Sequence, residues 1–163
     1  MGDNMAEYLE LLEESLVKKI GVLDRIGEFN LKQRELFTTY TESPDFDKFD
    51  SYIEEKDKLI SELNSLDDGF EALYERVAET LKADKAGNAT KIKRLQDLIR
   101  EVTDKSSALQ AQEAENKALI EKYFSSIKDG IGKGRTSLNA AYSYMQTQRG
   151  IGEVESLYMD SKK

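Results

Sequence analysis

The chain has 163 residues, a net charge of −8 and 34% charged residues, which is enough for one domain with a hydrophobic core. It contains no cysteine and no histidine. This composition excludes thiol chemistry, disulfides, the usual zinc sites and the commonest general base, so we expect a protein that is not an enzyme and that needs no cofactor.

The composition favours long helices. Pro44 is the single proline, tryptophan does not occur, and the good helix formers Glu, Lys, Leu and Ala are abundant. No apolar run approaches the roughly 18 residues that a membrane span needs. Because no targeting segment is evident either, we expect a cytoplasmic protein without an integral membrane segment.

The first predicted helix covers about residues 5–40. Its apolar residues recur every three or four positions, which places them on one helical face. Beyond it, Ser43 and Pro44 suit the N-cap and the first position of a new helix. The apolar face consists of Met5, Leu9, Leu12, Leu16, Ile20 and Leu23.

The second predicted helix covers about residues 45–82 and has the clearest pattern. Its apolar residues follow one heptad register that only Lys56 and Asp67 interrupt. Further leucines widen the stripe beyond a coiled-coil seam, which favours a bundle over a simple dimer. The stripe consists of Phe49, Ile53, Ile60, Leu63, Phe70, Tyr74, Val77 and Leu81.

The third predicted helix covers about residues 90–128. The connection before it, which contains Gly87 and Asn88, is too short to return the chain in parallel, so the second and third helices are predicted to be antiparallel. The heptad stripe turns polar at Gln112, Glu113 and Asn116. On either side of this interruption it consists of Ile92, Leu95, Ile99, Val102, Leu109, Ile120, Tyr123 and Ile127.

Charge is unevenly distributed along these helices. Residues 45–81 hold 12 acids and 4 bases, whereas residues 82–149 hold 13 bases and 8 acids. The second and third helices are therefore predicted to be electrostatically complementary. The basic part is diluted with acids and lacks regularly spaced aromatic residues, so no nucleic-acid partner is expected.

The acidic pairs in the helices offer little chemistry. Adjacent helical residues point about 100° apart, so Glu13-Glu14, Glu54-Glu55 and Asp67-Asp68 are interpreted as parts of a solvated face.

A glycine cluster follows the third helix. Gly130, Gly132 and Gly134 match neither the P-loop nor the dinucleotide-binding fingerprint, so they are interpreted as a compliant joint. A weaker helical tail is predicted at 131–148, stable only when something packs against it. These patterns together predict an all-α fold in a single domain of residues 1–163: an elongated antiparallel three-helix bundle or coiled coil with a flexible C-terminal helical segment.

Two segments resemble a known family. They are YIEEKDKLISELNSLDDGFEAL, from Tyr52 to Leu73, and LQAQEAENKALIEKY, from Leu109 to Tyr123. They are similar to the flagellar export chaperones of the FlgN type, in a Glu-Lys followed by leucines at helical spacing and a late Asn followed by Leu. The glycine cluster and the residues after Arg149 depart from that pattern.

The resemblance implies a chaperone that binds the disordered terminal segments of hook-filament junction proteins and keeps them soluble for the flagellar type III export apparatus. A structural coiled-coil adaptor or oligomerisation protein without a client shares the same periodicities and remains the alternative. A monomer or weak homodimer is expected in either case.

The wide stripe of the second helix is predicted to cover the first half of the third helix, and a client-binding surface is predicted where the third helix extends beyond the second. An apolar stripe without an assured internal partner marks an interaction site, here for an amphipathic client helix. If the first helix folds back over the stripe, the same residues are core. The predicted surface consists of Leu119, Ile120, Tyr123, Phe124, Ile127, Ile131, Leu138, Tyr142 and Met145.

Overall fold

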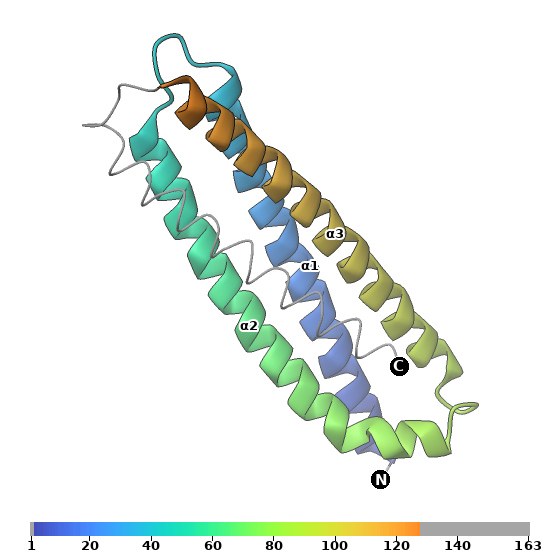
Figure 1. The fold of residues 1–163 in the computed structure, drawn as a ribbon. Coiled ribbons are helices and arrows are strands. Elements are labelled where there is room, and N and C mark those ends of the chain that lie inside the picture. Colours follow the sequence, from blue (N-terminus) through green and yellow to red (C-terminus); the bar gives the residue numbers. More distant parts are fainter. Residues whose placement is uncertain (1, 128–163) are drawn as a thin grey trace.

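The computed structural model describes residues 2–127, which form three long helices (Figure 1). The helices are α1 (Gly2–Thr38), α2 (Phe46–Ala83) and α3 (Ala89–Ser126). No strand occurs within these residues. The all-α three-helix prediction is confirmed, with helix bounds close to those expected, and the predicted tail at 131–148 lies outside the described residues.

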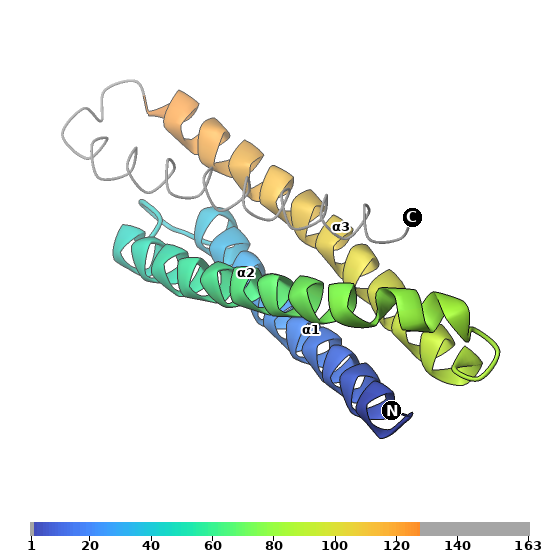
Figure 2. The ribbon, with the colours of Figure 1, turned by 90° about the horizontal axis from the view of Figure 1, so that it is seen from below.

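The central helix of the bundle is α1. It packs against both α2 and α3, whereas within residues 2–127 no Cα atom of α2 lies within 8 Å of one of α3. The chain runs up α1, down α2 and up α3, so α2 and α3 are antiparallel as predicted (Figure 1). Figure 2 shows α2 crossing α1 at an angle. The expectation that the second helix covers the third is wrong, because α1 takes that place.

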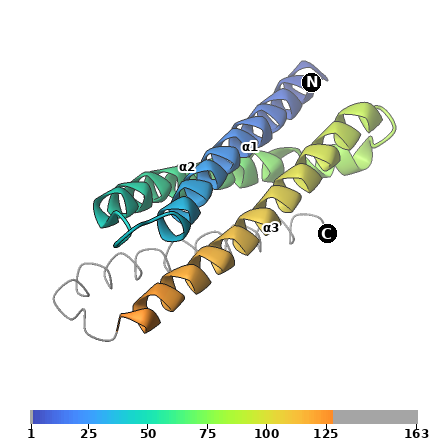
Figure 3. The ribbon, with the colours of Figure 1, turned by 90° about the horizontal axis from the view of Figure 1, so that it is seen from above.

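Helices α1 and α3 run in the same direction (Figure 3), and ion pairs join their edges. Glu13 pairs with Arg94 at 2.9 Å, Asp24 with Lys105 at 2.6 Å and Arg34 with Glu115 at 3.1 Å. The two partners are 81 residues apart in each pair, as a parallel pair of helices in one register requires. Each exposed pair contributes little energy, about 0–1 kcal/mol, but the set favours this register.

Burial along the heptad stripes reflects the central position of α1. Residues seven apart lie nearly above one another on a helix, so each heptad stripe consists of two rows. In α1 every member of both rows is buried. The rows are Leu9, Leu16, Leu23, Asn30 and Phe37, and Leu12, Lys19, Ile26 and Gln33.

The other two helices each have one completely buried row and one row that is covered only in part. The partly covered rows run through Ile60 and Tyr74 in α2 and through Ile92 and Ile99 in α3, and these four side chains are half-buried. Ile60, Ile92 and Ile99 are therefore less deeply buried than a heptad seam predicts, because α1 packs mainly against the other row of each stripe.

The start of α2 differs in detail from the prediction. The N-cap is Asp45, whose side chain accepts a hydrogen bond from the Lys48 backbone N–H at 3.1 Å, and not Ser43. Asp45 has the extended backbone that an N-cap needs, with φ −77° and ψ 95°. Pro44 is buried just before the helix and is not its first residue.

Candidate functional site at the aromatic end

Six aromatic residues gather at the end of the bundle where α1 passes into α2 and α3 terminates. Tyr123 of α3 is the centre of this group. Its ring centroid lies 5.9 Å from that of Phe37, 5.6 Å from Tyr40, 5.7 Å from Phe46 and 5.6 Å from Phe124. Tilted and edge-to-face contacts at these distances are the preferred geometry of aromatic pairs. We call this group the aromatic end: Phe37, Tyr40, Phe46, Phe49, Tyr123 and Phe124.

The predicted client-binding residues fall partly within this core. Ile120 and Tyr123 are buried, 3% and 8% exposed, in a cluster with Phe37, Phe49 and Ile53. The assumption that the stripe lacks an internal partner is therefore wrong here, because α1 and the start of α2 cover it. This is the alternative arrangement, in which the first helix folds back over the third.

The other predicted residues of α3 lie at the edge of the aromatic end. Leu119 and Phe124 are half-buried, and Ile127 is 38% exposed. Their role in client binding stays a prediction. The remaining predicted positions, Ile131, Leu138, Tyr142 and Met145, lie outside the described residues.

Sequence reasoning missed Tyr40, which is 40% exposed beside the buried Tyr123 ring. The available signal was the series of aromatic residues on both sides of Pro44, which brings rings from two helices to one turn. We call the accessible apolar edge of this end the aromatic rim: Tyr40, Phe46, Leu119, Phe124 and Ile127.

Below the aromatic end, one buried ionic contact joins all three helices. Lys56 Nζ of α2 lies 2.5 Å from Glu113 Oε1 of α3 and donates a hydrogen bond to Gln33 Oε1 of α1 at 3.0 Å. All three side chains are buried, Lys56 and Glu113 completely. Lys56 and Glu113, which interrupt the heptad stripes of α2 and α3, are therefore partners in one ion pair.

Buried amides extend this contact into a polar layer. Asn116 Nδ2 donates to the Asn30 carbonyl oxygen at 2.9 Å, and Asn30 Nδ2 donates to Gln112 Oε1 at 3.2 Å. The hydrophobic cluster of the aromatic end is separate from the larger cluster that fills the rest of the bundle. Because polar contacts interrupt apolar packing between the two clusters, we infer that the aromatic end is a local unit of stability.

A second buried ion pair lies within the main core. Lys19 of α1 donates to Asp67 Oδ1 of α2, and the two side chains are 0% and 4% exposed. The interpretation of Asp67 as part of a solvated face is wrong, although its neighbour Asp68 is exposed. Burial lowers the pKa of Lys19 to about 8 and raises the pKa of Asp67, because loss of hydration outweighs the attraction between the charges.

This pair predicts that stability depends on pH above neutrality. Between the pKa of Lys19 in the folded protein, about 8, and the ordinary lysine pKa of 10.5 in the unfolded chain, the unfolded chain binds more protons, so the free energy of unfolding rises with pH. We expect a rise of up to about 3 kcal/mol from Lys19, measured as urea midpoints between those pH values. A Lys19→Met/Asp67→Leu variant should lose this part of the slope; an equal slope in both proteins would contradict the assignment.

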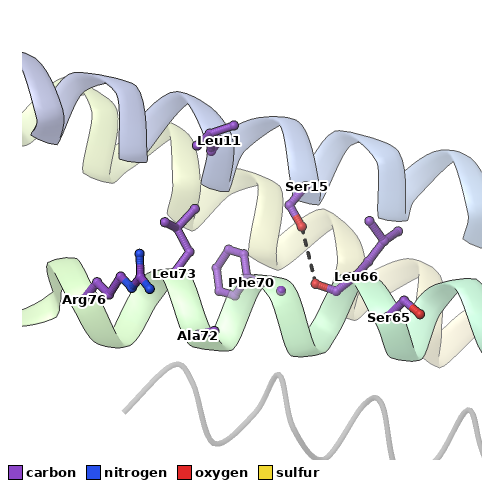
Figure 4. A pocket seen from close by; sticks show the side chains of 9 residues that line it. Leu11, Ser15, Ser65, Leu66, Phe70, Ala72, Leu73 and Arg76 are labelled. Carbon is purple, nitrogen blue, oxygen red and sulfur yellow. Dashed lines mark hydrogen bonds between the residues drawn. The ribbon is translucent and has the colours of Figure 1, made fainter.

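A shallow apolar hollow lies between α1 and α2 (Figure 4). Its volume is about 390 Å³, and Leu11, Leu66, Phe70 and Leu73 supply most of its apolar wall. Leu11 is 49% exposed, and Ser15 Oγ donates to the Leu66 carbonyl oxygen at 3.5 Å. Among the lining residues Arg76 alone is charged, so the hollow lacks the convergent polar groups typical of a cofactor site.

Residues 2–127 show neither a candidate metal-ion cluster nor a candidate membrane span. They contain no group of three or more Asp or Glu side chains placed to hold a metal ion. None of their helices combines the length and apolar character needed to cross a membrane.

The comparisons give no relative for this chain: no family model matches it, and no curated protein or solved structure is significantly similar.

Proposed function

We propose that this protein is an export chaperone that binds amphipathic segments of disordered clients at the aromatic rim. The observation that carries the proposal is accessible apolar surface at one end of a strongly charged bundle. Tyr40 and Ile127 are 40% and 38% exposed, and Phe46, Leu119 and Phe124 beside them are half-buried. Apolar and aromatic edges of this kind mark interaction sites on monomeric proteins.

The structure of the aromatic end suits a reversible binding site. Tyr rings supply large contact areas at low entropic cost, and the buried Tyr123 holds Tyr40 and Phe124 in place through ring contacts. The polar layer separates this end from the main core, so side chains here can rearrange around a client while the rest of the bundle stays folded. A client that becomes ordered on binding loses conformational entropy, which keeps the complex releasable.

The clients that we propose are the terminal segments of hook-filament junction proteins, handed on to the flagellar type III export apparatus. This choice rests on the resemblance of residues 52–73 and 109–123 to the FlgN-type chaperones. The net charge of −8 supports the role, because it disfavours association between loaded complexes. A structural adaptor without a client remains the second candidate, and the three-helix packing fits it equally well.

The direct test is binding of fluorescently labelled terminal segments of hook-filament junction proteins to the full chain, followed by anisotropy. A Tyr40→Ser/Ile127→Ser variant should bind about tenfold or more weakly, because two apolar anchors are lost, while its melting temperature stays close to that of the parent. The matched control is Val17→Ser, which removes a residue that is 49% exposed on α1 far from the rim.

The outcomes separate the two candidates. Binding that is weakened by the rim variant and kept by the control supports a chaperone with its client site at the aromatic end. Equal binding by both variants contradicts the rim as the site. No binding of any junction-protein segment to the parent chain contradicts the proposed clients and favours the adaptor.

A further inference from the structure

An apolar face that none of the other described helices covers lies between α2 and α3, on the side facing away from α1. Tyr74 of α2 and Ile92 and Ile99 of α3 are half-buried there, in the partly covered heptad rows. Tyr74 stacks on the buried Phe70 ring, with centroids 6.2 Å apart and planes 4° apart. We call the face formed by Tyr74, Ile92 and Ile99 the α2–α3 flank.

The heights of these residues follow from two contacts between the helices. Lys56 of α2 pairs with Glu113 of α3, and the ring of Phe46 of α2 lies 5.7 Å from that of Tyr123 of α3. A step of ten residues forward along α2 therefore matches a step of ten residues backward along α3. Antiparallel helices of equal rise keep this relation. It places Tyr74 at about the level of residue 95, between Ile92 and Ile99, so the three apolar side chains form one patch.

Opposite charges border this patch on its two sides. Glu71 and Glu75 are exposed on α2, and Lys93 and Arg100 are exposed on α3. By the same relation, Glu71 is level with residue 98 and Glu75 with residue 94. The acidic and basic edges therefore stand at the same height along the bundle.

These charges are not neutralised across the flank. Among the described residues, Glu71, Glu75 and Lys93 form no ion pair, and Arg100 contacts only Asp97 of its own helix, at 3.8 Å. No ion pair within residues 2–127 joins the acidic edge of α2 to the basic edge of α3. An occupant of the flank can pair with both edges.

We propose that the α2–α3 flank is the interface of a homodimer, occupied by the same flank of a second copy of this chain. A two-fold axis parallel to the helices lays α2 of each copy over α3 of the other. Glu71 and Glu75 then face Lys93 and Arg100 of the second copy, twice by symmetry, with the apolar patches in contact between them. Such a self-complementary surface is what an isologous interface requires.

Charge selects this occupant and this geometry. A basic foreign helix would suit the edge of α2 and be repelled at that of α3, and an acidic helix would do the reverse, whereas a second copy suits both. A two-fold axis across the helices would put α2 on α2 and acid on acid.

The test is the mass of the full chain in solution, measured by sedimentation equilibrium over a range of protein and salt concentrations. The parent should show a monomer–dimer equilibrium that weakens with salt. Two double variants, Glu71→Lys/Glu75→Lys and Lys93→Glu/Arg100→Glu, should each dimerise at least about tenfold more weakly than the parent. In each variant both edges of the flank carry charge of the same sign, so the two copies repel each other. An equimolar mixture of the two variants should form a heterodimer. Glu10→Lys/Glu14→Lys, two exposed acids of α1, is the control with an equal change of charge.

Circular dichroism first establishes that each variant is folded. A parent that stays monomeric at every concentration overturns the proposal, as does a mixture that fails to associate or a control that is weakened as much as the flank variants.

Discussion

Replacing Lys19 with methionine should lower the free energy of unfolding by about 3–5 kcal/mol, because it leaves the Asp67 carboxylate buried without its cation. Asp67 is 4% exposed and Lys19 completely buried, so water cannot take the place of the lost partner. The pKa of Asp67 is already raised by burial, and without Lys19 it should rise further. Urea unfolding at neutral pH, followed by circular dichroism, measures the loss.

The double variant Lys19→Met/Asp67→Leu should recover most or all of that stability. It removes both charges together and fills the space with apolar atoms, a change that is often neutral or stabilising by about 1–4 kcal/mol. The apolar neighbours of Lys19 in its row, Leu12 and Ile26, are themselves fully buried and suit such a replacement. A double variant as unstable as Lys19→Met would contradict the burial of an ion pair at this place.

The helices and their bounds could be predicted because their signals are local. Apolar residues at intervals of three and four specify an amphipathic helix, and the Pro44 and Gly87 regions interrupt the pattern. Which helix is central could not be predicted, because all three carry stripes of the same period. The stripe of α1 even contains Lys19, Asn30 and Gln33, which a sequence pattern would assign to solvent and which the structure buries.

The polar interruptions illustrate a second limit. Lys56, Asp67 and Glu113 each break a heptad stripe, and each is buried against an opposite charge from another helix. Their partners are far away in the chain: Lys19 and Asp67 are 48 residues apart. A charged residue in an apolar stripe indicates that a partner of opposite charge is buried with it, but the sequence does not show which residue that is. The pairs can be assigned only when the positions of the helices are known.

The candidate site was predicted in part for the same reason. The aromatic and aliphatic residues at the end of α3 do gather at one end of the bundle, but Ile120 and Tyr123 belong to its core and only Leu119, Phe124 and Ile127 lie at its edge. Exposure depends on which helix covers the stripe, and periodicity carries no information on that. Tyr40 escaped notice because it lies in a loop, where no periodic pattern applies.

Replacing Tyr123 with alanine should cost about 3–5 kcal/mol, the usual range for a large aromatic residue in a core. Its ring contacts those of Phe37, Tyr40, Phe46 and Phe124, so the cavity would lie at the centre of the aromatic end. Because the polar layer separates this end from the main core, we expect the damage to be local. In this variant, amide exchange around residues 37–50 and 117–126 should be clearly faster than around Leu16, Leu63 and Val102 of the main core, because the aromatic end opens while the rest stays folded.

The conservative variant Tyr123→Phe tests whether the ring contacts are responsible. It keeps all four, so its stability should stay within about 1 kcal/mol of the parent. Both variants should be compared by urea unfolding and by exchange measured peptide by peptide. If exchange in Tyr123→Ala is equally fast throughout the three helices, the aromatic end opens only with the whole bundle, and the polar layer does not divide the protein into two units of stability. If exchange is faster at that end than in the main core, a client can reorganise the aromatic rim without unfolding the helices that hold Lys19 and Asp67.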